Sequence, residues 1–143
     1  MRNGKLGSMK VGKLGSGLIC MLLLASACAS SPAAPTDPET VTLAPGATTT
    51  YGDLRLTFVR ITGDSRCPGD AICITAGDAQ AAIETNVSGF PRASEVHLFA
   101  TDKRTIAHGD YTITFEGLAP YPFVSLGPIQ PANYRATFKI SRK

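Results

Sequence analysis

The chain has 143 residues, with 14 Lys and Arg, 11 Asp and Glu, 14 Gly, 10 Pro and no Trp, which suffices for one ordinary domain but not for two well-packed ones. The formal charge of +3 is misleading, because four basic residues precede the first acid, Asp37: Arg2, Lys5, Lys10 and Lys13. From residue 28 onward 10 Lys and Arg stand against 11 Asp and Glu, a net charge of −1 (10 − 11). We therefore expect no nucleic-acid partner, since phosphate binding needs a clustered basic surface.

The N-terminal segment has the three-part layout of a secretory signal peptide. A basic stretch ends at Lys13, an apolar run covers residues 18–24, and the small residues Ala25-Ser26-Ala27 precede Cys28. The apolar run is about half the roughly 20 residues that a membrane-spanning helix requires. We expect residues 1–27 to be a cleaved signal peptide, with translation starting at Met1 or at Met9, and the protein to leave the cytoplasm.

The end of this segment resembles the lipobox of bacterial lipoproteins, in which small residues after a Leu-rich run precede a Cys that is lipidated and becomes the new N-terminus. The resemblance implies lipidation of Cys28, and therefore a cell-envelope protein at the membrane periphery that contacts the membrane through its N-terminal lipid. Ala29 after the Cys resembles the sorting rule for the outer membrane, in preference to the inner one, in a bacterium with two membranes. The alternative is a secreted protein, because Ala25-Ser26-Ala27 also satisfies the A-x-A cleavage rule.

Two cysteines remain for the folded part, Cys67 and Cys73, because Cys20 belongs to the signal segment. An even pair in an exported domain predicts one disulfide. Zinc would require four ligands, and the nearest imidazoles in the sequence, His97 and His108, are distant from this pair. We expect a Cys67–Cys73 disulfide and no metal site.

Residues 28–38 are expected to form a flexible tether, because the segment after Cys28 holds three prolines and no large apolar side chain. From residue 39 to 143, apolar and polar residues alternate with period two between Gly, Pro, Asn and Asp turn signals. The clearest strands cover 54–58, with a phase slip typical of a bulge before Ile61, and 111–116 and 134–141; weaker ones cover 40–43, 48–51, 78–87, 94–100 and 104–107.

Seven or eight short strands over residues 39–143 predict an all-β domain, a single two-sheet β-sandwich that is immunoglobulin-like in style. A small β-barrel is the alternative. Six aromatic side chains are expected in the core, because they alternate with polar residues in the predicted strands: Phe58, Phe99, Tyr111, Phe115, Tyr134 and Phe138.

The chain from residue 28 onward has no nucleophile elbow, phosphate loop, H-E-x-x-H, C-x-x-C or dinucleotide motif. His97 alternates with Val96 and Leu98, which predicts a solvent-facing strand position, and His108 precedes the turn signal Gly109-Asp110. We expect no catalytic residue, no cofactor and no enzymatic activity.

The most unusual segment is residues 64–78, where Pro68-Gly69 suits the centre of a type II turn and the disulfide would close a rigid, water-facing loop. Its candidate partner-binding residues are Asp64, Arg66 and Asp70. Even with Asp78 included, the acidic residues of this segment are too sparse for a calcium site, since calcium takes about six oxygen ligands. The alternative is structural: Asp64 and its neighbour start the turn, and Arg66 pairs with an acid to hold it.

This loop also carries a resemblance. The run D-S-R-C-P, followed after four residues by C-x-x-A-G-x-A, resembles a signature of small, uncharacterised bacterial lipoproteins and secreted domains with a single β-rich fold. The resemblance extends to residues 118–122 and 134–137, and it departs at Thr75, where the pattern often has an aromatic residue. It implies a fold and a location, and no activity.

These features predict a cell-envelope lipoprotein whose β-domain is a non-enzymatic binding or structural module, with another envelope protein as a possible partner. The alternative is an inhibitor or ligand-binding module that acts through the disulfide loop 64–78.

Overall fold

The computed structural model describes residues 37–143. The expected signal peptide, the lipidation site Cys28 and most of the expected tether lie outside the described residues. Between residues 37 and 143 no helix is long and apolar enough to cross a membrane.

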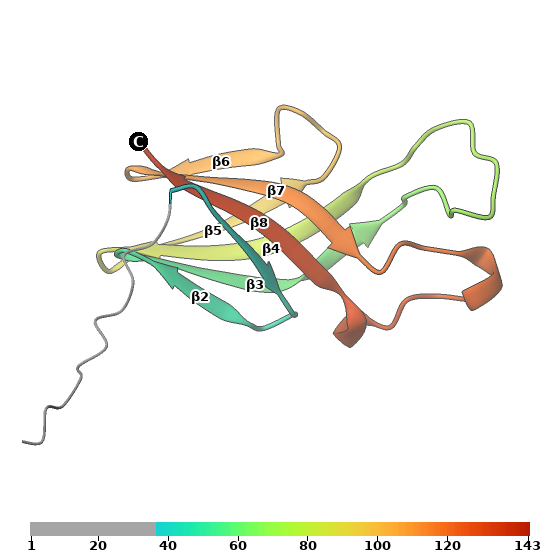
Figure 1. Cartoon of the computed structure of the whole chain (residues 1–143), viewed down its shortest axis with the longest axis horizontal. Coiled ribbons are helices and arrows are strands. Elements are labelled where there is room, and N and C mark those ends of the chain that lie inside the picture. Colours follow the sequence, from blue (N-terminus) through green and yellow to red (C-terminus); the bar gives the residue numbers. More distant parts are fainter. Residues whose placement is uncertain (1–36) are drawn as a thin grey trace, which may run out of the picture. The chain divides into compact units, whose positions relative to one another are not determined.

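The described chain forms two antiparallel four-stranded sheets, one in the order β1-β8-β7-β6 and the other in the order β2-β3-β4-β5 (Figure 1). The strands are β1 (Glu39–Leu43), β2 (Thr48–Tyr51), β3 (Leu54–Asp64), β4 (Ala79–Val87), β5 (Phe90–His97), β6 (Thr105–His108), β7 (Tyr111–Ala119) and β8 (Arg135–Arg142). Two short 3₁₀ helices, η1 (Val124–Leu126) and η2 (Pro131–Asn133), lie between β7 and β8.

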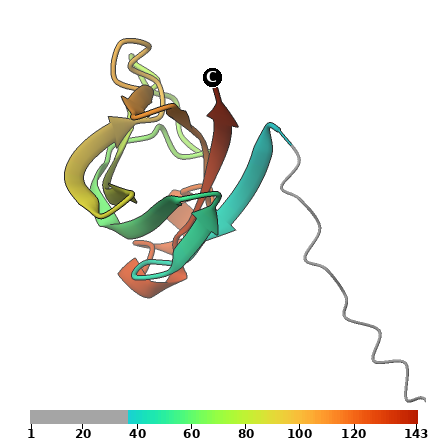
Figure 2. The same ribbon diagram turned by 90° about the vertical axis from the view of Figure 1, so that its left-hand side faces the viewer.

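The two sheets face each other across the core (Figure 2), and the predicted two-sheet β-sandwich is confirmed. No ladder joins the two sheets in the described part of the chain, so they do not close into the small barrel that was the alternative. β2 to β5 and β6 to β8 are each a meander of consecutive strands, which differs from the strand order of immunoglobulin domains.

The bulge predicted in β3 is present. The register between β3 and β4 shifts between Phe58 and Arg60, and again between Ile61 and Gly63. Each shift adds a residue to β3 and increases the local twist. Beyond the bulges β3 stays paired with β4 as far as Asp64, which lies opposite Ala79 and begins the segment singled out in the sequence.

The strand expected at 94–100 lies earlier, at Phe90–His97. Ser88 and Gly89 form a tight turn in which both residues have positive φ, 50° and 90°, and this turn pairs Val87 directly with Phe90. Pro91 argues against a strand in the sequence, because proline cannot donate a backbone hydrogen bond to a neighbouring strand. It is accommodated here because β5 is an edge strand.

Alternating side chains of both sheets fill the core. Phe58 and Phe115 both pack on Phe138, with ring centroids 6.0 and 5.4 Å apart. Four of the six aromatic residues expected in the core are buried there, and Tyr134 is half-buried. The prediction for Phe99 is wrong: this residue is 54% exposed, because β5 ends at residue 97. The core consists of Leu43, Tyr51, Leu54, Leu56, Phe58, Ala79, Ala81, Ile83, Val96, Leu98, Tyr111, Ile113, Phe115, Leu118, Ala136, Phe138 and Ile140.

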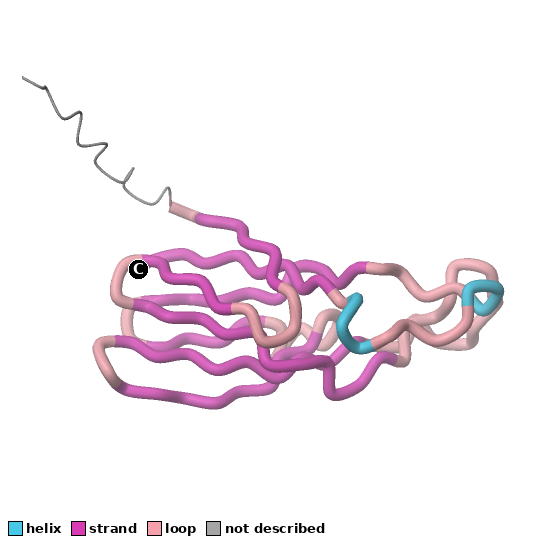
Figure 3. Tube along the Cα trace, turned by 90° about the horizontal axis from the view of Figure 1, so that it is seen from below, coloured by secondary structure: helices cyan, strands magenta, loops and turns pink. Residues whose placement is uncertain are grey.

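The two ends of the sandwich differ. The β3–β4 loop, residues 65–78, and the β7–β8 loop, residues 120–134, extend beyond the same end (Figures 1 and 3). We call these two loops together the tip. The chain enters the sandwich at the other end, because Glu39 pairs with Ile140 near the end of β8, whereas Leu43 pairs with Ala136 near its start.

Candidate functional site

The disulfide predicted in the first loop of the tip is confirmed: Cys67 and Cys73 are bonded, with their Cα atoms 5.9 Å apart. The loop continues the β3–β4 hairpin, since the Cys67 N–H donates to the Ala76 carbonyl at 2.9 Å. The expected type II turn at Pro68-Gly69 is wrong. The Ala71 N–H donates to the Pro68 carbonyl at 3.1 Å, and Gly69 does not have the positive φ that a type II turn requires, so the turn starts at Pro68.

Gly77 is required by the stem of this loop. Its φ is +71°, and a Cβ on this residue would collide with the backbone carbonyl of Ser65. This close approach allows the Ser65 N–H to donate to the Asp78 carbonyl at 2.8 Å and the Asp78 N–H to donate to the Ser65 hydroxyl at 3.0 Å. Gly77 is therefore required by the close approach of the two sides of the stem.

Arg66 is buried, with an exposed fraction of 4%. Its guanidinium donates to Asp64 through Nε at 2.8 Å and Nη2 at 2.7 Å, and it reaches the end of β7, where Nη1 donates to the Leu118 carbonyl at 2.6 Å. Nη2 also donates to the Pro120 carbonyl at 3.0 Å, and the Tyr121 ring lies 5.4 Å from the guanidinium carbon. Arg66 therefore joins the ends of β3 and β7.

Asp64 completes this cluster. Besides Arg66 it accepts a hydrogen bond from the Tyr134 hydroxyl at 3.0 Å. Burial alone would raise the pKa of the Asp64 carboxyl, but the hydrogen bonds and positive charge of Arg66 outweigh that effect and hold the pKa below its ordinary value. The same environment raises the pKa of Tyr134, through burial and the hydrogen bond to Asp64.

These contacts correct the expectation of a partner-facing Arg66. The side chain of Arg66 is 1% exposed and that of Asp64 is 11% exposed, and both are bonded within the domain. The structural alternative, in which Arg66 pairs with an acid to hold the loop, describes what these two side chains do.

Asp70, the third candidate, is exposed but is also bonded within the tip. Its carboxylate accepts hydrogen bonds from the backbone N–H groups of Val124 at 2.7 Å and Ser125 at 2.9 Å, which begin η1. These two bonds lower the pKa of Asp70. The Gly69 N–H donates to the Pro122 carbonyl at 2.9 Å beside them, so the two loops form one unit.

The outer surface of this unit carries large apolar side chains and few charges. No charged residue occurs from residue 117 to 134 or from 71 to 77. Ile72 and Ile74 are as exposed as in an extended chain, and Leu126 is 80% exposed. The exposed large apolar residues of the tip are Ile72, Ile74, Tyr121, Phe123, Val124 and Leu126.

Two recesses lie beside these projecting side chains. One, of about 330 Å³, lies between the loops and is lined by Pro68, Phe123, Ile129 and Tyr134 among others, with Asp64 and Arg66 also on its wall. The other, of about 370 Å³, shares Phe123 and Ile129 and adds Tyr121 and Leu126. Phe123 forms a wall of both recesses, so the tip combines projections with hollows.

The two histidines are bonded to neighbouring side chains. The expectation of a solvent-facing His97 is wrong: its side chain is 12% exposed, and Nδ1 lies 2.7 Å from an Asp78 oxygen at the base of the disulfide loop. Its Nε2 lies 3.6 Å from a Glu95 oxygen. His108 ends β6, and its Nδ1 lies 2.7 Å from the Thr85 hydroxyl of the other sheet. Within residues 37–143 no group of three His, Cys, Asp or Glu could hold a metal ion.

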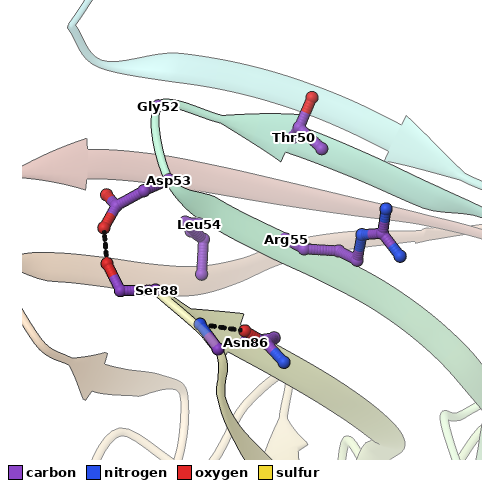
Figure 4. A pocket seen from close by; sticks show the side chains of 8 residues that line it. Thr50, Gly52, Asp53, Leu54, Arg55, Asn86 and Ser88 are labelled. Atoms are coloured by element: carbon purple, nitrogen blue, oxygen red, sulfur yellow. Dashed lines mark hydrogen bonds between the residues drawn. The ribbon is translucent and has the colours of Figure 1, made fainter.

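A smaller recess of about 280 Å³ lies at the opposite end, between the β2–β3 and β4–β5 turns (Figure 4). Its one acid, Asp53, accepts hydrogen bonds from the Ser88 and Tyr111 hydroxyls, and these bonds lower its pKa. Asp53 thus fixes the turns to the core, and the tip remains the stronger candidate site.

No family model, curated protein or solved structure matches the chain.

The tip overlaps only in part with the site predicted from the sequence. The prediction selected charged residues of the disulfide loop and passed over its isoleucines. For the second loop, the sequence feature that could have indicated an apolar surface is the run from 117 to 134, which contains prolines and no charged residue.

Proposed function

We propose that this chain is an exported cell-envelope lipoprotein, anchored through Cys28, whose β-sandwich domain is a non-enzymatic binding module that acts through its tip. The observation that carries the proposal is the apolar tip. Six large apolar side chains are exposed on two adjacent loops that are clamped together.

The tip has the properties of a binding surface. A contiguous exposed apolar patch is costly for a soluble domain, and such patches commonly mark interaction sites. The disulfide, the Arg66 cluster and the Asp70 bonds fix the loops before any partner arrives. A preformed surface loses little conformational entropy on binding, so more of its contact energy appears as affinity.

The non-enzymatic part of the proposal is supported by the contacts of the histidines. Both nitrogens of His97 face acids, Asp78 and Glu95, and neither lies against a serine or cysteine among the described residues. The Nδ1 of His108 lies 2.7 Å from the Thr85 hydroxyl, but Thr85 is only 2% exposed, so this pair is closed to a substrate. Nucleophilic catalysis needs a nucleophile and a base within hydrogen-bonding reach of each other.

The location is supported by the sequence. The signal-like segment, the lipobox resemblance and the D-S-R-C-P resemblance all imply export, and the lipobox implies the anchor. Ala29 favours the outer membrane in a bacterium with two membranes.

The anchor is tested by comparing wild type with Cys28→Ser by intact mass and cell fractionation. We expect an acyl mass on the wild type, which sediments with membranes, and release of the variant as a soluble exported protein. Equal soluble release of both proteins, with no acyl mass on the wild type, would contradict the anchor and leave ordinary secretion.

The binding role is tested with the released Cys28→Ser protein. Labelled protein is added to envelope fractions of a strain that lacks the gene, with increasing unlabelled protein as competitor. We expect saturable binding that the competitor displaces. A linear, undisplaceable signal would contradict the binding role.

The full exposure of Ile72, inside the ring closed by Cys67–Cys73, and of Ile74, directly after it, favours one alternative: an inhibitor or ligand-binding module that uses residues 64–78 alone. In that case Ile74→Ser abolishes binding and Leu126→Ser does not. If both loops contact the partner, both variants weaken it.

A further inference from the structure

The tip is open to three kinds of occupant: a lipid bilayer, a second copy of the chain, or another folded protein. We propose that the occupant is another folded protein, located away from the anchoring membrane, whose contact surface is apolar and carries no acidic side chain. This inference rests on the proposed function and identifies its partner class.

The shape of the tip favours a folded protein. A bilayer accepts projecting apolar side chains but does not fill a hollow of fixed shape. The tip has both, since Leu126 is 80% exposed while Phe123 lines two recesses of about 330 and 370 Å³. Protein interfaces bury anchors in pockets of this kind.

The charges of the tip also disfavour a bilayer. Attachment to anionic lipid is assisted by Lys and Arg near the surface. The basic residue in the two loops is Arg66, which is buried and paired with Asp64, and the guanidinium of Arg135, directly after the second loop, donates to the Ala132 and Tyr134 carbonyls. The other charged residues there are acids: Asp78, which lies against His97, and Asp70, which is exposed. The negative charge of Asp70 therefore disfavours an acidic group of a lipid or of a partner at this position.

The path of the chain gives a third argument. Glu39 enters at the end of the sandwich opposite the tip, and the sandwich is about 30 Å long, as estimated from the nine residues of β7. Residues 28–38 span at most about 40 Å when fully extended. For the tip to reach the anchoring bilayer, the tether would have to run almost fully extended along the whole sandwich and past the loops. A partner beyond the tip requires no such extension.

The experiment is site-specific photo-crosslinking of the full-length lipoprotein in its host cell. A benzophenone amino acid replaces Leu126 in the tip or, as the control, Phe90 at the opposite end. The two positions are matched, being 80% and 74% exposed. We expect a discrete protein adduct from position 126 and none from position 90. The adduct is identified by mass spectrometry, and its crosslinked segment should be apolar and free of Asp and Glu.

The identified partner is then purified, and its affinity is measured for wild type, Leu126→Asp and Phe90→Asp. We expect at least a tenfold loss for Leu126→Asp and less than a twofold change for Phe90→Asp, with equal melting temperatures. Equal affinity for all three proteins would overturn the inference, as would a crosslinked segment rich in acids.

The other occupants give distinct results. An adduct of twice the chain mass means a second copy. Cosedimentation of the Cys28→Ser protein with vesicles of three parts phosphatidylethanolamine to one part phosphatidylglycerol, abolished by Leu126→Asp, means a bilayer. Either result overturns the inference and leaves the binding module in place. An adduct from position 90 alone overturns the choice of surface, and no adduct from either position, with no saturable envelope binding, overturns the proposed function itself.

Discussion

Asp70 and Val124 are 54 positions apart in the chain, yet the carboxylate of Asp70 accepts the Val124 backbone N–H at 2.7 Å. Together with the Ser125 bond, this contact satisfies the first N–H groups of η1, which the helix itself leaves unpaired. It also transmits the constraint of the disulfide loop to the second loop. The tip is therefore one unit built from two loops.

Removal of this contact should loosen the second loop alone. In Asp70→Ala we expect several-fold faster amide exchange at Val124 and Ser125, with little change in the exchange of the core strands, because the carboxylate is exposed and remote from the core. Asp70→Asn should give an intermediate effect, since it keeps one acceptor oxygen. Hydrogen exchange measured by NMR checks this, and unchanged exchange at both amides would show that the contact does not hold the loop.

Arg66→Ala should destabilise the whole domain. The substitution leaves the Asp64 carboxylate and the Leu118 carbonyl without their buried donor, and breaking such a pair costs about 3 kcal/mol. For a domain of this size, the melting temperature should fall by more than about 10 °C. Arg60→Ala, on the exposed face of the same strand, is the control and should change stability by less than about 0.5 kcal/mol. Equal melting temperatures for the two variants would contradict the structural role of Arg66.

The lowered pKa of Asp64 predicts a pH dependence of stability. Its pKa in the folded state lies below the value of about 3.9 that it has in the unfolded chain, so its contribution is complete above that pH and is lost as the pH falls through the folded-state pKa. Denaturant unfolding between pH 6 and pH 2 should show less acid destabilisation in Asp64→Asn than in wild type. Asp53, Asp70 and Asp78 also have lowered pKa values, so the dependence is reduced in the variant and not removed. Identical slopes for the two proteins would refute the assignment to Asp64.

Gly77→Ala should be far more costly than Gly46→Ala. Both glycines have positive φ, +71° and +79°, which costs alanine about 1 kcal/mol or more. At Gly46 the added methyl group meets open space, whereas at Gly77 it meets the Ser65 carbonyl. We expect about 1 kcal/mol at Gly46 and about 3 kcal/mol at Gly77 by urea unfolding. Similar losses at both positions would mean that the loop stem relaxes around the methyl group.

Local patterns predicted the fold well, because successive side chains of a β-strand face the core and the solvent in turn, so that apolar and polar residues alternate in the sequence. The bulge after Phe58 and the disulfide are also local features, and both were predicted. The arrangement of the tip was not predicted, since the contacts that build it join residues 52 to 70 positions apart, such as Arg66 with Leu118 and Asp64 with Tyr134. From the sequence alone, a charged loop residue is predicted to face solvent. That prediction fails for Arg66 because the carbonyls that accept its hydrogen bonds lie in a distant segment of the chain.

The most direct test of the central claim, that the apolar tip is the binding surface, is competition by tip variants in the envelope-binding assay. Unlabelled Cys28→Ser protein that also carries Leu126→Asp is compared with the same protein carrying Phe90→Asp, after both are shown to melt at the temperature of the parent. The account predicts that the Phe90→Asp protein displaces the labelled parent at the concentration the parent requires, and that the Leu126→Asp protein fails to do so at a tenfold higher concentration. Equal displacement by the two variants would contradict the account.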